Sequence, residues 1–217
     1  CSPQIHLDFL GSEELQEVTL QPSPARDKIL MIDVEGTIST YVSQGLFARE
    51  KNLPGAIYSR LERAAGDPAI KAVILRLDTP GGEVTASDII YHQILKFKAD
   101  THKPVLGLMM GLAASGGYYI AVACDYIIAH PSTLTGSIGV ISIFPDIHDL
   151  MARVGVKVNV IKSAEAKDAG SPFRDMTIEE KKIFQGIIDE YFEGFLAVVA
   201  AGRKDKIPAD ELRRIAD

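Results

Sequence analysis

One short segment of the chain places a serine among small residues. Ser115 follows Ala113 and Ala114 and precedes Gly116 and Gly117. A serine at a helix N-terminus gains from the positive end of the helix dipole, and the amide that follows it can donate a hydrogen bond to an oxyanion. The segment therefore fits a nucleophilic serine with Gly116 as an oxyanion donor. It also fits an ordinary N-cap serine followed by flexible glycines.

A second segment joins a buried strand pattern to a glycine-rich turn. The run L-D-T-P-G-G ends at Gly82. Glycine allows a backbone N–H to face a ligand with no side chain in the way, as an oxyanion hole requires. The same letters are typical of a plain turn between a strand and a helix, and Pro-Gly-Gly by itself favours that interpretation. Gly82 is thus a candidate oxyanion donor only in combination with Ser115.

A nucleophilic serine needs a general base, and the histidines offer poor choices. Each lies in a predicted tether, in an amphipathic helix, before a turn or next to the end of a strand or helix, where surface and packing roles are usual. Only the histidine beside Pro131 stays open as a base. The five are His6, His92, His102, His130 and His148.

A lysine can replace histidine as the base if burial lowers its pKa enough to leave it neutral near working pH. Lys167 is the candidate, in a polar loop over residues 163–175 that follows a predicted strand. The alternative is a solvated loop lysine close to Glu165 and Asp168.

The rest of the chain predicts the elements that position these residues. Strand patterns occur at residues 29–34, 72–78, 105–110, 126–129 and 157–161. Helix patterns occur at residues 55–65 and 86–98, from about 115, from Thr177, where Glu180 completes a capping box, and at 208–216. This alternation predicts an α/β fold, in which ligands gather at the carboxyl ends of strands. Residues 79–82 and 111–117 should therefore meet at one edge of the sheet.

Composition limits the classes of function and the number of domains. Of the 217 residues, 47% are hydrophobic, which suffices for one core; we expect a tether at residues 1–27 and one domain at 28–217. The net charge of −6 and the lack of a basic cluster argue against a nucleic-acid partner. Two cysteines, Cys1 and Cys124, are too few for a disulfide framework or a zinc motif.

The two ends of the sequence leave the anchoring open. Cys1 at the first position fits either a lipid-carrying mature N-terminus or an arbitrary boundary. No apolar run reaches the roughly 20 residues that span a bilayer. The last predicted helix stops at Ala216 without a closing strand, so we expect a further segment to follow.

Taken together and in this order, the segments resemble the signal peptide peptidase A family over residues 28–217. The nucleophile segment A-S-G-G-Y-Y matches Ala114–Tyr119, and the lysine loop matches Ser163 and Lys167–Pro172. Ala164 stands where the family usually has glycine. The resemblance implies the Clp-type protease and crotonase-like fold, a stack of ββα units.

The resemblance also implies a function and a set of roles. Ser115 is the nucleophile and Lys167 the general base of a serine endopeptidase, Gly82 and Gly116 form the oxyanion hole, and Ser137 orients the lysine. No metal or cofactor takes part. The implied substrates are signal peptide remnants or other membrane-associated peptides, cleaved outside the cytoplasm at a membrane surface by a homo-oligomeric ring.

Two rival functions share the expected fold. A crotonase-type acyl-CoA enzyme would use the same pair of backbone donors on an enolate, and it would need carboxylates near the oxyanion hole. A catalytically silent scaffold would bind peptides in the ring, with no reason to keep Ser115, Ser137 and Lys167 together.

Overall fold

The protein is built on a twisted parallel β-sheet. The computed structural model describes residues 17–41, 52–203 and 206–216. Four strands pair in the order in which they occur in the chain, and β5 (Leu134–Gly136) pairs with the end of β3 beyond β4. The four are β1 (Lys28–Glu35), β2 (Ile70–Thr79), β3 (Val105–Ala114) and β4 (Tyr126–Ala129). Because all pairs are parallel, the strands end at a common edge.

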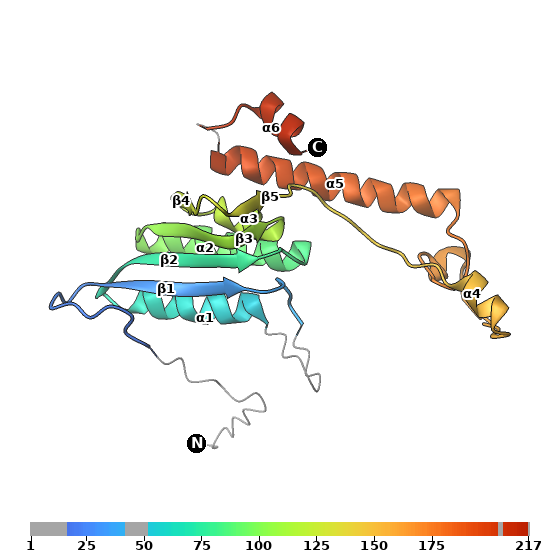
Figure 1. Ribbon diagram of the computed structural model, residues 1–217, viewed down its shortest axis with the longest axis horizontal. Coiled ribbons are helices and arrows are strands. Elements are labelled where there is room, and N and C mark those ends of the chain that lie inside the picture. Colours follow the sequence, from blue (N-terminus) through green and yellow to red (C-terminus); the bar gives the residue numbers. More distant parts are fainter. Residues whose placement is uncertain (1–16, 42–51, 204–205, 217) are drawn as a thin grey trace, which may run out of the picture.

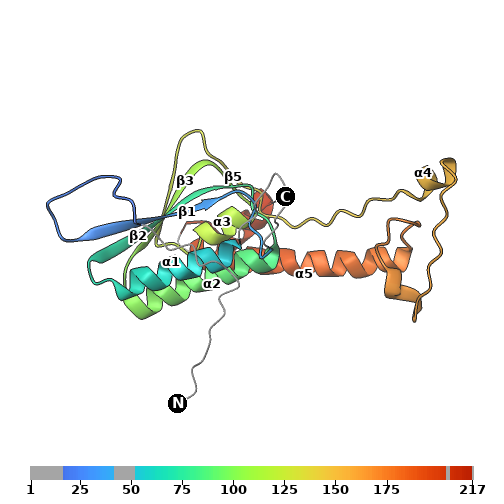
Figure 2. The same ribbon diagram turned by 90° about the horizontal axis from the view of Figure 1, so that it is seen from below.

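Helices in the crossovers cover one face of this sheet. Figure 2 shows α1 (Leu53–Gly66) and α2 (Val84–Thr101) side by side on that face. Asn52 caps α1, because its side chain accepts a hydrogen bond from the Gly55 amide at 3.0 Å. The shared core contains fully buried aliphatic side chains from strands and helices, which include Val73, Leu75, Leu77, Ile57, Ile90 and Ile94.

The second half of the chain leaves the sheet and returns along a long helix. A short helix, α3 (Gly116–Ala121), follows β3. Residues 140–175, hereafter the arm, contain α4 (His148–Arg153) and the 3₁₀ helix η1 (Glu165–Asp168). Figures 1 and 2 agree that the arm extends away from the sheet, beside the first part of α5 (Ile178–Arg203). The last part of α5 packs on the core through Phe195, Leu196 and Val199, and α6 (Ala209–Ala216) follows.

The arm exposes many apolar side chains. Ile161 is fully exposed, and Ile141 and Ile143 are each 79% exposed. The strand predicted at residues 157–161 is wrong, since that segment forms neither strand nor helix. Its alternating valines suit a strand, but a strand also needs a neighbour for its backbone groups. Among the described residues, none pairs with this segment.

The other predicted elements are confirmed. Each of the remaining strands and helices lies within a few residues of its predicted place. The capping box opens α5 as expected: the Glu180 amide donates to Thr177 Oγ1 at 3.1 Å, and the Thr177 amide donates to Glu180 Oε2 at 2.9 Å. β1 begins at Lys28, and residues 17–27 form no helix or strand. The role of residues 1–27 as a tether stays a prediction, because residues 1–16 lie outside the described part.

Candidate active site

Ser115 lies in a strained turn between β3 and α3. Its backbone has φ 51° and ψ −119°, a combination that a non-glycine residue keeps only when its surroundings enforce it. The Ser115 amide donates to the Gly136 carbonyl at 2.9 Å, and its carbonyl accepts from the Tyr119 amide at 3.0 Å. The strand pair β3–β5 and the first turn of α3 thus fix the serine at the end of the sheet.

The glycine turn after β2 packs directly against this serine turn. A Cβ on Gly81 would lie 2.6 Å from the Gly116 amide nitrogen and 2.9 Å from Ser115 Cβ. A Cβ on Gly82 would lie 2.1 Å from the carbonyl oxygen of Ile38. Only glycine fits at either place. The predicted meeting of residues 79–82 and 111–117 at one edge is therefore confirmed.

Two backbone amides near Ser115 are available to a ligand. Within the described parts of the chain, neither the Gly82 nor the Gly116 amide donates to a protein acceptor. Gly116 is buried at the first position of α3, where helix amides have no partner within the helix. This arrangement suits the oxyanion hole that the sequence predicts.

A hollow beside Ser115 is lined mostly by apolar and aromatic side chains. It lies between the start of α2, α3, the chain after β5, and α5. Tyr119 closes one side: its hydroxyl donates to Asp88 Oδ1 at 2.8 Å, and its ring lies 5.0 Å from that of Phe195. Burial raises the pKa of Tyr119, so this phenol stays neutral. The lining residues are Gly82, Val84, Ser87, Ser115, Gly116, Tyr119, Gly139, Val140, Tyr191 and Phe195.

Lys167 does not reach Ser115 within the one chain. It lies on η1 in the arm, is exposed, and does not line the hollow. Figure 1 shows the arm leaving the sheet near β5 and reaching the start of α5, well away from α3. The neighbouring Asp168 carboxylate accepts hydrogen bonds from Lys162 and Arg174. The structure thus brings Ser115, Gly82 and Gly116 together and leaves the predicted base apart from them.

Ser137 lies close to the serine turn, and His130 does not. Ser137 has φ 50° and directly follows Gly136, the residue that accepts from the Ser115 amide. Its part in orienting a lysine stays a prediction. His130 is exposed, and its Nδ1 lies 2.7 Å from Ser132 Oγ. It does not line the hollow around Ser115.

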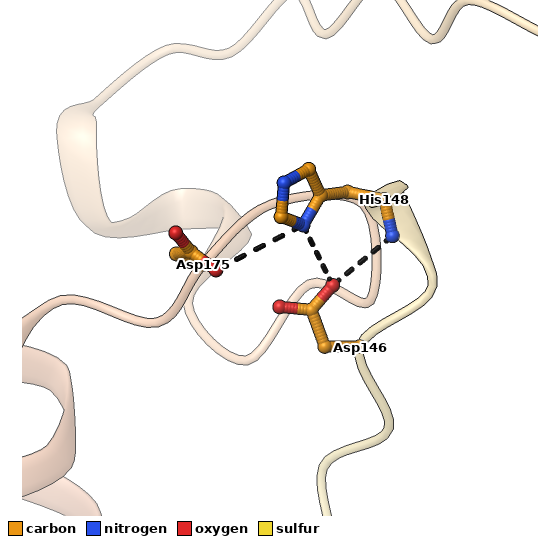
Figure 3. Close-up of side chains that lie close together, drawn as sticks. All are labelled: Asp146, His148 and Asp175. Carbon is orange, nitrogen blue, oxygen red and sulfur yellow. Dashed lines mark hydrogen bonds and ion pairs between the residues drawn. The ribbon is translucent and has the colours of Figure 1, made fainter. Parts of the chain in front are cut away.

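A charged cluster in the arm escaped the sequence reasoning. Figure 3 shows His148 between two aspartates, with Nδ1 2.9 Å from Asp146 Oδ1 and 3.8 Å from Asp175 Oδ1. The hydrogen bond with Asp146 raises the pKa of His148. The D-x-H spacing could have suggested the first pair, but Asp175 is distant in sequence. The cluster ties the start of α4 to the loop before α5.

Comparison with known proteins identifies the family. Residues 97–217, more than half of the chain, match the model of peptidase family S49. The chain belongs to this family. Residues 51–134 also match the Clp protease model. The resemblance to signal peptide peptidase A and the α/β Clp-type fold are thereby confirmed.

Several relatives of this S49 chain carry protease names. A protein of Enterococcus faecium assigned as signal peptide peptidase SppA is 34% identical, over 96% of this chain and 60% of its own length. Protease 4 of Haemophilus influenzae is 36% identical, over 86% of this chain and 29% of its own. The chloroplastic serine protease SPPA of Arabidopsis thaliana is 30% identical, over 97% of this chain and 31% of its own length. The chain thus spans less than two thirds of these relatives.

A solved structure is also similar. It is a membrane-bound stomatin-specific protease mutant in complex with a substrate peptide, with 25% identity and a TM-score of 0.43, covering 56% of this chain and 49% of the other. Among the described helices of the present chain, none has the length and apolar character needed to cross a membrane.

Proposed function

We propose that this chain is the catalytic part of a serine endopeptidase with Ser115 as nucleophile and Lys167 as general base. The observation that carries the proposal is the strained Ser115 turn, packed against the glycine turn, with the Gly82 and Gly116 amides donating to no acceptor among the described residues. Family membership and the protease names of the relatives support it.

The mechanism follows from these groups. A neutral Lys167 amine takes the proton of the Ser115 hydroxyl, and the serine oxygen attacks the scissile carbonyl carbon. The Gly82 and Gly116 amides hold the oxyanion that forms. Lys167 then gives its proton to the leaving amine, and water hydrolyses the acyl-enzyme with the lysine again as base. Ser137, next to the Gly136 carbonyl that holds Ser115, orients the amine.

We propose further that Lys167 of one copy serves Ser115 of another copy in a homo-oligomeric ring. Two observations support this. The lysine lies on an arm that does not return to its own serine. The arm also carries unpaired, alternating valines, of which Val156 and Val160 are each 50% exposed and Val158 is 43% exposed. A neighbouring copy would bury these side chains and complete the backbone hydrogen bonds of the segment.

The proposed substrates are apolar peptides, namely signal peptide remnants or other membrane-associated peptides. The apolar and aromatic lining of the hollow supports them, because such a surface binds aliphatic side chains and offers no charge to a basic one. We place the activity outside the cytoplasm, at a membrane surface. Lipid attachment at Cys1 would supply an anchor, but Cys1 lies outside the described residues.

One observation weighs against the acyl-CoA alternative. A crotonase-type enzyme needs carboxylates beside the oxyanion hole, and the residues that line the hollow include none. A catalytically silent scaffold needs no reactive serine, so it predicts that Ser115 does not react with an acylating reagent, whereas the peptidase predicts that it does. Covalent labelling of Ser115 therefore separates the peptidase from both.

The test combines labelling with peptide hydrolysis. Ser115→Ala should stay folded and lose hydrolysis by roughly 10⁴-fold or more, because the small site is filled without a nucleophile. Lys167→Ala and Lys167→Arg should be similarly inactive, since a guanidinium stays protonated. His130→Ala is the matched control and should keep full activity. Activity in Ser115→Ala, or its loss in His130→Ala with Lys167→Ala unaffected, would refute the dyad.

Mixing two inactive variants tests the sharing of the dyad. Ser115→Ala and Lys167→Ala chains are unfolded, mixed and reassembled. Sites between copies would then pair an intact Ser115 with an intact Lys167, so part of the activity should return. A dyad formed within one chain predicts no recovery at all.

A further inference from the structure

Arg174 joins the lysine loop to the start of α5. Its guanidinium donates from Nε and Nη2 to the two carboxylate oxygens of Asp168, at 3.1 and 2.8 Å. It also donates from Nη1 to Glu180 Oε2 at 3.0 Å and from Nη2 to Glu180 Oε1. Nη2 reaches the Asp168 carbonyl as well, at 3.2 Å. One planar cation thus bridges two carboxylates that lie on different elements.

This bridge is partly buried and is reinforced on both sides. The Glu180 side chain is 7% exposed and that of Asp168 is 14% exposed. Glu180 also forms the capping box with Thr177. On the other side, Lys162 Nζ donates to Asp168 Oδ1 and to the Glu165 carbonyl, both at 2.7 Å. Both ends of η1 are therefore attached through the Arg174 cluster, which we define as Lys162, Asp168, Arg174 and Glu180.

The charges in the cluster cancel. Hydrogen bonds from Arg174 hold the pKa of Asp168 and of Glu180 well below the usual range, so both carboxylates are ionised at any working pH. Two cations balance these two anions. Other charged groups nearby are Glu165 on η1 and the Asp175–His148 pair, in which Asp175 follows Arg174 directly. Loss of Arg174 alone would leave one uncompensated negative charge beside η1.

Lys167 lies directly before Asp168 on η1. A lysine can accept a proton from serine only while its amine is neutral, and a free carboxylate nearby favours the charged form. We propose that Arg174 is a positioning residue for Lys167, because it fixes η1 on α5 and balances the charge of the Asp168 carboxylate, which follows Lys167 in the sequence. This inference rests on the proposed Ser115–Lys167 function.

The experiment measures the pH dependence of Ser115 labelling by a fluorophosphonate in the assembled protein. The rate should rise with pH as the lysine becomes neutral and then level off. Arg174→Gln makes the cluster net negative and should move the midpoint upward by about one pH unit, which slows labelling below the midpoint about tenfold. Asp168→Asn makes the cluster net positive and should move the midpoint downward. The double variant should return close to the original midpoint.

Two further variants separate charge from geometry. Arg174→Lys keeps the charge but cannot bridge both carboxylates with a planar fork, so it should keep the midpoint and lower the plateau rate. Arg153→Gln, an exposed arginine of α4 in the same arm, is the matched control and should change neither value. Circular dichroism and size-exclusion chromatography report folding and assembly. If Arg174→Gln does not fold, Asp168→Asn and Glu180→Gln must both lower the midpoint.

The outcomes are distinct. Opposite shifts that cancel in the double variant support the positioning role. A fixed midpoint, shifts of equal sign, or a uniform loss of rate in Arg174→Gln would overturn it and leave Arg174 as a structural clamp. Failure of the unaltered protein to label at Ser115 would overturn the proposed function itself, together with this inference.

Discussion

Replacement of Gly81 by alanine would test how closely the two turns at the candidate active site depend on each other. Gly81 has φ +96°, and an added Cβ would lie within 3.0 Å of Gly116 N, of the Ala114 carbonyl oxygen and of Ser115 Cβ. The forced left-handed φ costs about 1–2 kcal/mol. The overlap costs about 1–3 kcal/mol more, because it meets backbone and Cβ atoms that cannot rotate away. We therefore expect Gly81→Ala to lose at least about 2 kcal/mol of unfolding free energy.

The overlap can be relieved only by moving one turn away from the other. A displacement of the proposed nucleophile, Ser115, by about 1 Å can cost about 100-fold in rate, so labelling of Ser115 should slow by roughly that factor. Urea unfolding gives the free energy, and fluorophosphonate labelling of the folded fraction gives the rate. Gly66→Ala is the control, because an added Cβ at this last position of α1 meets no atom within 4 Å. A Gly81→Ala variant with unchanged stability and labelling would refute the proposed contact between the turns.

Three further properties can be predicted from the described residues. Small or aliphatic residues should be favoured next to the scissile bond, since the hollow offers apolar walls; a peptide library cleaved chiefly after Arg or Lys would contradict this. Burial raises the pKa of Cys124 to about 12, so iodoacetamide should modify it only as fast as the protein unfolds, and rapid native-state labelling on peptide mapping would show otherwise. An NMR pH series should give His148 a pKa above the ordinary histidine value of about 6.5. Its pairs with Asp146 and Asp175 should stabilise the arm fully below pH 6.5, and this stabilisation should be lost as pH rises through the raised pKa of His148. Hydrogen exchange in the arm, corrected for the intrinsic rate, should therefore become faster with rising pH. Slower exchange at higher pH would contradict the prediction.

The sheet, the helices and the turn at Ser115 could be predicted, because each depends on local sequence pattern. An apolar run indicates the strand before Ser115. The glycines after Thr79 and Ser115 indicate positions where two backbone segments approach each other closely. The capping box of Thr177 and Glu180 can be recognised from a segment of four residues, and it is present in the structure. In a parallel sheet, the ends of neighbouring strands meet, so placing the strands also places the candidate oxyanion donors.

The arm could not be predicted, because its conformation depends on contacts beyond local sequence. Valines at alternate positions indicated a strand at residues 157–161, but the pattern says nothing about whether a partner strand is present in the same chain. The Arg174 cluster joins residues of the lysine loop to Glu180, a residue that the sequence assigned to capping alone. Asp175 reaches His148 only because the arm folds back on itself.

The separation of Ser115 and Lys167 has a physical consequence for control of the proposed reaction. An ordinary lysine has a pKa of about 10.4, so a solvated one is almost wholly protonated at neutral pH and cannot accept a proton. Desolvation is what removes that charge, and an exposed arm provides none. In the proposed assembly, the exposed apolar side chains of the arm would be buried against a partner surface, and the amine would lose water in the same event. Assembly would then create the proposed base as well as bring it to the serine, so that isolated chains, even with the candidate oxyanion donors beside Ser115, would carry no peptidase activity.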